Sequence, residues 1–162
     1  MERVGSNPAR FFSELEKLAL FGAGRTLEVA DIDLLVAPEE TDRIFLGLDA
    51  LAAGRRPEAS ALLRESARLK KSALPVFGLL AWQLRQLLSI RELYDGKVQD
   101  PARIASKLRI APFVAVKNLK IISAFPLERT RQGLKLLSRY DRDLKRGALD
   151  EYAALDLFVW KL

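Results

Sequence analysis

The sequence contains neither cysteine nor histidine among its 162 residues. Without cysteine it can form no disulfide framework and no thiolate metal site, and without histidine it lacks the commonest metal ligand and general base. No apolar run approaches the roughly 18 residues that a membrane-spanning helix needs. The opening residues, MERVGSNPAR, hold no hydrophobic segment of the signal-peptide kind. We therefore expect a cytoplasmic protein with no membrane partner, and the absence of cysteine fits a reducing compartment.

Motifs for catalysis are also missing. The sequence has no G-x-x-x-x-G-K-[ST] phosphate loop, no G-x-G-x-x-G after a strand and no H-E-x-x-H. Its carboxylates show no catalytic spacing, because Asp31 and Asp33 do not face each other on a helix, and Asp141 and Asp143 alternate with arginines as on a solvated surface. We expect no catalytic residue, no cofactor and no metal site in this chain.

Positive charge is concentrated in one half of the chain. The net charge is +6, yet residues 97–146 hold 13 Lys and Arg against 4 Asp and Glu, a local +9. The remaining 14 basic and 17 acidic residues sum to −3. Such a span can attract polyanions, although a helical bundle also covers its solvated faces with Lys and Arg.

Hydrophobic periodicity predicts an all-α fold. The clear patterns repeat every 3.6 residues, and no stretch shows the sustained alternation of a strand. The predicted N-caps are Asn7, Thr26, and Thr41 or Asp42, and two further helices are predicted to start at Asp100 and Asp150. APEET, residues 37–41, is the predicted linker. The predicted helices, nine in all, cover 8–21, 27–36, 42–53, 57–71, 74–94, 126–146 and 150–162, with two short ones starting at Pro101 and Pro112. The apolar helix at 74–94 is expected to be the central rod of the bundle.

The stretch IASKLRIAPFVAVKNL, residues 104–119, has the spacing of a helix-turn-helix. Ile104, Ala105, Leu108 and Ile110 are expected to be buried in its first helix and turn, and Val116 and Leu119 in its second helix. The turn that would read bases is Pro112 to Ala115, which offers no bidentate donor, so we interpret the motif as a structural corner. The candidates for contact with a DNA backbone are Lys107, Arg109, Lys117 and Lys120.

Six segments in order carry a resemblance to a known family. They are GSNPARFFSELEKLALF, TLEVADIDLLV, IFLGLDALAAGRRPEASALL, LLAWQLRQLL, IAPFVAVKNL and YDRDLKRGALDEYAALDLFVWKL. Together they cover nearly the whole chain, which resembles the C-terminal part of the delta subunit of the bacterial DNA polymerase III clamp loader. The terminal helix departs from the family pattern at Asp156, where a Glu is usual, and in its bulky ending FVWKL.

The resemblance implies a domain organisation. Residues 1–37 are similar to the last two helices of an AAA-type lid domain, and residues 41–162 to the complete helical collar domain. The family's N-terminal domain, which binds and opens the sliding clamp, is outside this sequence. The subunit is not expected to hydrolyse ATP, in agreement with the missing phosphate loop.

The resemblance also implies a role in assembly. Collar domains of the family pack side by side and hold the loader together around primed DNA, so the implied partners are the gamma/tau and delta-prime type subunits. Matching positions are Gln83, Arg85, Gln86, Pro112, Phe113, Lys117, Lys145 and Gly147, of which Gln83, Arg85, Gln86, Phe113 and Lys117 are the candidates for a subunit interface. The alternative is a nucleic-acid-binding helical domain that uses the basic span 97–146.

Overall fold

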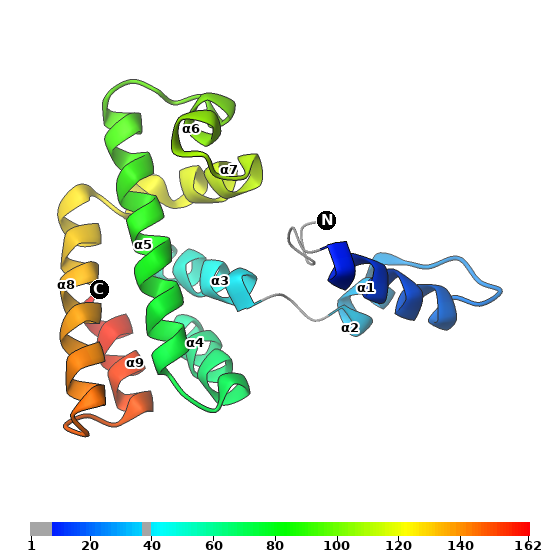
Figure 1. The fold of residues 1–162 in the computed structure, drawn as a ribbon, viewed down its shortest axis with the longest axis horizontal. Helices are drawn as coiled ribbons and strands as arrows, with labels where there is room; N and C mark the ends of the chain where they lie inside the picture. The colour runs from blue at the N-terminus through cyan, green and yellow to red at the C-terminus, as the bar shows by residue number, and fades with distance from the viewer. Residues whose placement is uncertain (1–7, 37–39) are drawn as a thin grey trace. The chain divides into compact units, whose positions relative to one another are not determined.

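The computed structural model describes residues 8–36 and 40–162 (Figure 1). Within these ranges the chain forms nine α-helices and one short 3₁₀ helix, with no strand, which confirms the all-α prediction. The predicted cap Asn7 and most of the predicted linker, residues 37–39, lie outside the described residues. The chain divides into two compact units, Met1–Arg43 and Ile44–Leu162.

The first unit contains α1 (Pro8–Phe21) and α2 (Val29–Leu35), which pack against each other. Helix α1 has the predicted bounds, but α2 begins two residues later than predicted and its N-cap is Glu28, not Thr26. Asp31 explains the shift. Its carboxylate accepts a 2.9 Å hydrogen bond from the backbone N–H of Glu28 and two bonds, of 3.0 and 2.7 Å, from the guanidinium of Arg25.

Apolar side chains of this unit remain largely exposed. The apolar periodicity over residues 27–36 predicts that Leu27 and Ala30 are buried, and both are exposed. Helix α1 likewise presents Phe12 and Leu20 to solvent. Two short helices have too little surface to cover each other's apolar faces, so the periodicity identified the helices without identifying what they bury.

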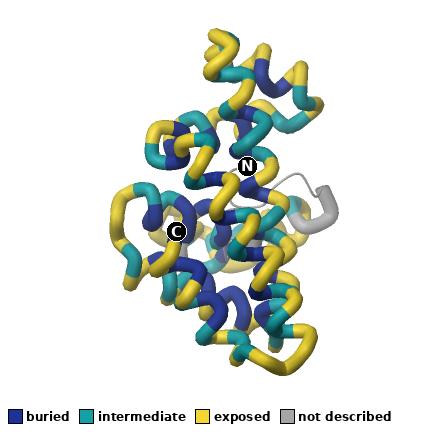
Figure 2. The backbone as a smooth tube through the Cα atoms, turned by 90° about the vertical axis from the view of Figure 1, so that its left-hand side faces the viewer, coloured by how far each residue is buried: buried dark blue, intermediate teal, exposed yellow. Residues whose placement is uncertain are grey.

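The second unit is a bundle built around α5. Helix α5 (Leu74–Asp95) packs against α4, α6, α7 and α8, as predicted for a central rod. The other helices are α3 (Glu40–Ala52), α4 (Arg56–Lys70), α6 (Pro101–Leu108), α7 (Pro112–Ile121), η1 (Ile122–Ala124), α8 (Leu127–Lys145) and α9 (Glu151–Lys161). Figure 2 marks the buried positions along these helices, and the fully buried side chains of α5 include Val76, Leu80, Leu84, Leu87 and Ile90.

Most predicted helix ends are confirmed. Asp100 caps α6 through the N–H of Arg103 at 2.8 Å, and Asp150 caps α9 through the N–H groups of Tyr152 and Ala153. Gly147 follows α8 with a φ of +67°, the left-handed conformation expected of a glycine after a helix. Helix α3 instead begins at Glu40, ahead of both predicted caps, Thr41 and Asp42.

Helix α8 approaches α5 closely at Gly133. A Cβ placed there would lie 2.7 Å from Cδ1 of Leu84 and 3.0 Å from Cδ1 of Leu162, both of which are buried. A larger residue at position 133 would therefore force these leucine side chains to shift or the helices to separate. Figure 1 shows α8 running beside α5 along most of its length.

Two acidic side chains join α9 to α4 and its following turn. Glu151 accepts a 3.2 Å hydrogen bond from the hydroxyl of Ser72 and another from the backbone N–H of Ala73. Asp156 accepts a hydrogen bond from Ser60 and lies 3.6 Å from the guanidinium of Arg64. Asp156 is thus a link between α4 and α9.

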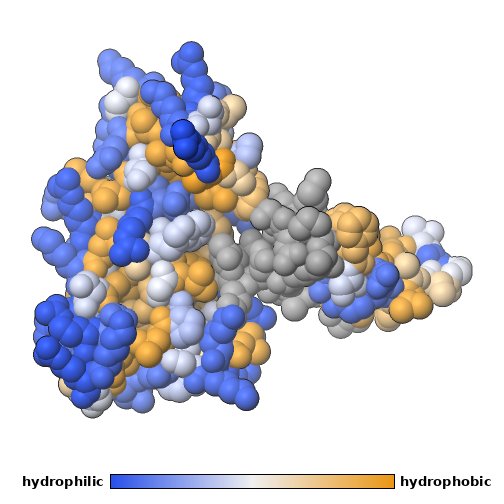
Figure 3. Space-filling view, in the orientation of Figure 1, coloured by the Kyte–Doolittle hydropathy of each residue, from blue (hydrophilic) through white to orange (hydrophobic). Residues whose placement is uncertain are grey.

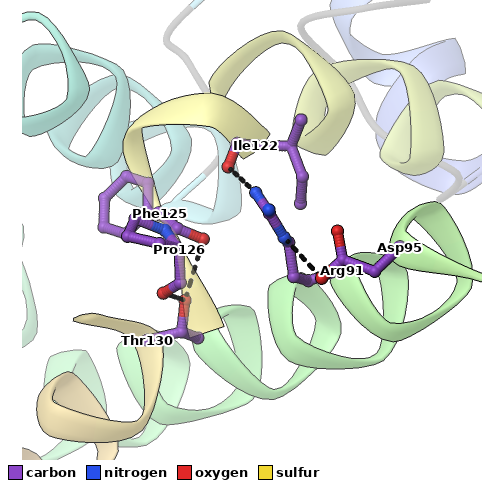
Figure 4. A network of polar contacts seen from close by, with 6 residues as sticks. All are labelled: Arg91, Asp95, Ile122, Phe125, Pro126 and Thr130. Atoms are coloured by element: carbon purple, nitrogen blue, oxygen red, sulfur yellow. Dashed lines mark hydrogen bonds and ion pairs between the residues drawn. The ribbon is translucent and has the colours of Figure 1, made fainter. Parts of the chain in front are cut away.

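Arg91 and Thr130 form hydrogen bonds that hold the turn between α7 and α8 (Figure 4). Arg91 of α5 donates through Nε to Asp95 at 3.0 Å and through Nη1 to the carbonyl of Ile122 at 3.1 Å. The buried hydroxyl of Thr130 lies within 3.3 Å of the carbonyl oxygens of Phe125 and Pro126. These contacts add side-chain donors to the backbone carbonyls of the turn that leads from η1 into α8.

Arg129 extends this network to α9. Its Nε donates to the carbonyl of Leu162 at 2.8 Å and its Nη1 to the carbonyl of Ala124 at 2.6 Å. The guanidinium carbon also lies 4.7 Å from the centre of the Phe125 ring. One side chain thereby holds η1, α8 and the end of α9 together.

Candidate interface surfaces of the helical bundle

Gln83, the first interface candidate, lies inside the bundle. Its side chain is 1% exposed and donates from Nε2 to Oδ1 of Asn118 at 2.7 Å. Asn118 in turn donates to the carbonyl of Val114 at 2.8 Å. The pair links α5 to α7, so the contact that Gln83 makes in this chain is internal.

Arg85 and Gln86 lie on different sides of α5. Arg85 is exposed and lines a groove of about 360 Å³ between α5 and α8, together with Gly78, Ala81, Ser138 and Asp141. Gln86 is half-buried, one helical turn after the exposed Trp82. Both side chains therefore reach solvent, at least in part.

Phe113 and Lys117 meet at the junction of α3 and α7. The Lys117 ammonium lies 5.0 Å from the centre of the Phe45 ring and 5.7 Å from that of Phe113, distances typical of cation–π contacts. Asp49 of α3 lies near this cation. Burial raises the pKa of the Asp49 carboxyl, against the opposing attraction of Lys117, Lys120 and Arg55. Phe113 remains 42% exposed beside a cation that is directed at the protein's own aromatic rings.

The other DNA-backbone candidates are exposed on α6 and α7. Lys107 lies in the last turn of α6 and Arg109 is its C-cap, with a φ of +53°, while Lys120 lies in the last turn of α7. Helices α6 and α7 pack together as the predicted corner, with Ile104 and Ala105 buried as expected.

The buried face of α7 differs from the prediction. We expected Val116 to be buried, but it is 41% exposed, and α7 packs through Val114, Ala115, Asn118 and Ile121. A helix that begins at Pro112 places position 116 on the side opposite Val114. The polar Asn118, which the apolar pattern passed over, lies on the buried side.

One exposed apolar surface was missed by the sequence reasoning. Helix α9 buries Ala154, Leu155, Phe158 and Val159 against α4 and α8. On its opposite side Trp160 is 60% exposed and Leu157 is 36% exposed. We call these two residues the α9 outer face. The signal in the sequence is that α9 is apolar around most of its circumference, a pattern typical of a helix covered on all sides.

The described residues contain no group of three or more acidic side chains placed to hold a metal ion. Nor is any helix among them both long and apolar enough to cross a membrane.

Comparisons with known proteins agree with this architecture. A curated relative, DNA polymerase III subunit delta of Bacillus subtilis (strain 168), is 23% identical over 160 residues, which are 98% of this chain and 46% of the relative. The solved structure of the Bacillus subtilis DNA clamp loader delta protein superposes with a TM-score of 0.86 at 22% identity, over 98% of this chain and 47% of that chain. This chain thus spans about half the length of each. The family described as DNA polymerase III delta subunit, C-terminal domain, matches residues 41–162, and the chain therefore belongs to this family.

Proposed function

We propose that this chain is the assembly module of a clamp-loader delta subunit, acting in the bacterial cytoplasm during DNA replication. Residues 41–162 act as a collar domain that binds the corresponding domains of gamma/tau and delta-prime type subunits, and residues 1–37 belong to a lid domain. Family membership and the all-α bundle support this proposal. Any contact with the sliding clamp is made by parts of the delta subunit outside this chain.

The observation that carries the proposal is the α9 outer face. Trp160 and Leu157 are large apolar side chains one turn apart, on a helix that is otherwise packed into the bundle. Exposed tryptophan at the centre of an apolar surface is the usual anchor of a protein interface. We assign this face to one neighbouring subunit.

If the collar domains pack side by side in a closed ring, this domain needs a second face for its other neighbour. Each member of a closed ring meets its two neighbours through two different faces. Phe113 and Lys117, at the junction of α3 and α7, are the candidates for the second face, where Phe113 would supply apolar area. Arg85, in the groove between α5 and α8, and Gln86 remain separate candidates for contact with a neighbouring subunit.

Size-exclusion chromatography with light scattering tests the assembly. The chain, mixed with the collar regions of gamma/tau and delta-prime type subunits, should elute as a stable mixed complex. Leu157→Ala combined with Trp160→Ala should weaken that complex by about 30-fold or more in Kd, as for an interface anchor worth roughly 2 kcal/mol. Trp160 is 60% exposed, whereas Leu157 is 36% exposed and partly packed, so the melting temperature should fall only by the packing that Leu157 loses.

Leu69→Ala is the control, because Leu69 is a large apolar side chain, 56% exposed, on α4 and outside the proposed faces. If Leu69→Ala abolishes the complex and the α9 variant does not, the assignment to α9 is wrong. A chain that binds none of these partners would contradict the assembly role itself.

A further inference from the structure

The exposed side of α8 carries a regular row of positive charges. The row consists of Arg131, Lys135, Arg139, Arg142 and Arg146. Their spacing along the helix is four, four, three and four residues, which places all five within an arc of roughly 80° and along roughly 22 Å. The opposite side of α8 buries Thr130, Gly133, Leu137 and Tyr140 against the bundle. We call these five residues the α8 basic row.

Most of this charge is not neutralised inside the protein. Within the described part of the chain, Lys135, Arg142 and Arg146 form no ion pair or side-chain hydrogen bond. Arg131 pairs with Glu128 at 3.3 Å and Arg139 with Asp143 at 3.7 Å, both as exposed contacts on the same helix, which contribute little. Figure 3 shows strongly hydrophilic side chains gathered over the C-terminal end of α8.

Acidic residues of α8 border the row without interrupting its C-terminal half. Asp141 accepts a 2.7 Å bond from Lys145, and it lies on the side of α8 that faces the groove with α5. Asp143 lies on the other border. Of the acidic residues on α8, Glu128 alone falls in the arc of the row, at its N-terminal end.

We propose that the α8 basic row binds the phosphate backbone of double-stranded nucleic acid. Evenly spaced cations on a straight helix match a regular line of phosphates. The row contains no aromatic side chain on which an unpaired base could stack, which favours a duplex over a single strand. The apolar side of α8 is buried in the bundle, so the helix has no apolar face to insert into a membrane. The choice of a nucleic acid rests on the proposed clamp-loader function, whereas the geometry of the row does not.

The α8 basic row lies within the basic span 97–146, but it contains none of the four residues named as DNA-backbone candidates from the sequence. Lys107, Arg109 and Lys120 lie on α6 and α7, and Lys117 is directed at Phe45 and Phe113. The α8 row is longer, more regular and carried by one rigid element. It makes no base contact, so binding should be independent of sequence.

The test is fluorescence anisotropy with a labelled duplex of about 20 base pairs at several salt concentrations. The logarithm of the association constant should fall with the logarithm of salt concentration at a slope of about −4, as expected when four to five phosphates are neutralised. Lys135→Glu combined with Arg142→Glu should weaken binding at least about tenfold at low salt and reduce the slope by about 2.

Lys107→Glu combined with Lys120→Glu is the matched control. Both double variants lower the net charge from +6 to +2, since each of two replacements changes +1 to −1. The control should keep the slope of the unmodified chain. Equal losses in the two variants would show that net charge, not the α8 row, controls binding, and the proposal would be wrong.

Three further outcomes would overturn the proposal. They are no duplex binding at low salt, tighter binding to a single strand than to the duplex, and binding to anionic lipid vesicles without binding to DNA. The partner-binding assay separates this proposal from the proposed function. The α8 double variant should still form the complex with partner collar regions, and the variant of Leu157 and Trp160 should still bind the duplex.

Discussion

At the scale of single residues, Arg129 stabilises the bundle through hydrogen bonds to backbone carbonyls. Arg129 is half-buried, and burial lowers the pKa of its guanidinium, with the nearby positive charge of Arg56 adding to the effect. Its two hydrogen bonds go to carbonyls of Ala124 and Leu162, on segments far apart in the sequence. A planar guanidinium can make both bonds at once, which an ammonium on a flexible stem cannot.

Arg129→Lys should therefore lower the free energy of unfolding by about 2 kcal/mol, because one or both charged hydrogen bonds are lost. Chemical denaturation measures this change. Arg131→Lys is the control on the same helix. Arg131 is exposed and pairs only with Glu128 among the described residues, so its replacement should change stability by less than about 0.5 kcal/mol. Equal effects of the two replacements would contradict the role given to Arg129.

Asp49 gives a prediction about pH. Burial raises its pKa, so in the folded chain the carboxyl binds its proton more tightly than in the unfolded chain. Stability therefore falls as pH rises from the ordinary aspartate pKa through the raised one, and the cost remains in full at neutral pH. Asp49→Asn removes that cost.

The Asp49→Asn variant should melt at a higher temperature than the unmodified chain at pH 7. The two should converge below about pH 3, where aspartate is largely neutral in both folded and unfolded chains. Thermal melts across this pH range provide the measurement. A variant that is less stable at pH 7 would mean that the attraction of Lys117, Lys120 and Arg55 outweighs the burial of the carboxylate.

At the scale of helices, two glycines test how closely α5 and α8 pack. Gly78 of α5 faces open space, and a Cβ there would meet no atom within 4 Å, whereas at Gly133 of α8 it would collide with buried leucines. Gly78→Ala should stabilise the chain by roughly 0.5–1 kcal/mol through helix propensity. Gly133→Ala should destabilise it by about 1–2 kcal/mol, because overpacking outweighs the same gain. Chemical denaturation of both variants measures the free energy of unfolding. If Gly133→Ala stabilises the chain as Gly78→Ala does, α5 and α8 do not pack as closely at Gly133 as described.

Helix positions were predictable because caps and prolines are local signals. Pro8, Asp100, Pro112 and Asp150 set the starts of four helices through contacts within a few residues. Helix α2 was misplaced because its start depends on Arg25, which binds Asp31 from outside the helix. Local pattern therefore determined which segments are helical, but not every boundary.

The sides that the helices bury were harder to predict. Gln83 is an interface candidate through the family resemblance, and its burial could not be predicted from the apolar pattern, because its partner Asn118 lies 35 residues away. Trp160 and Leu157 were counted with the rest of an apolar helix. Hydrophobic periodicity alone cannot distinguish the buried side of such a helix from its exposed side, since both sides are apolar.

At the scale of the whole molecule, the bundle separates its two proposed binding surfaces. The α9 outer face is apolar and the α8 basic row is charged, and each lies on the side of its helix away from the core. Helices α8 and α9 pack against each other through their other sides. One small domain can thus bind a protein neighbour and a polyanion with different chemistry.

The contact between α4 and α9 determines when this domain can be completed during synthesis. Ser60 and Asp156 are 96 residues apart, and α5 to α8 lie between them in the sequence. The ribosome must therefore make nearly the entire bundle before α4 meets its partner, and closing so long a loop has an entropic cost. Until α9 arrives, the side of α4 that it covers, with the buried Ala59 and Leu63, lacks this partner. The core is therefore completed and the α9 outer face formed in the same late step. A chain that still lacks α9 has neither a complete core nor the proposed interface.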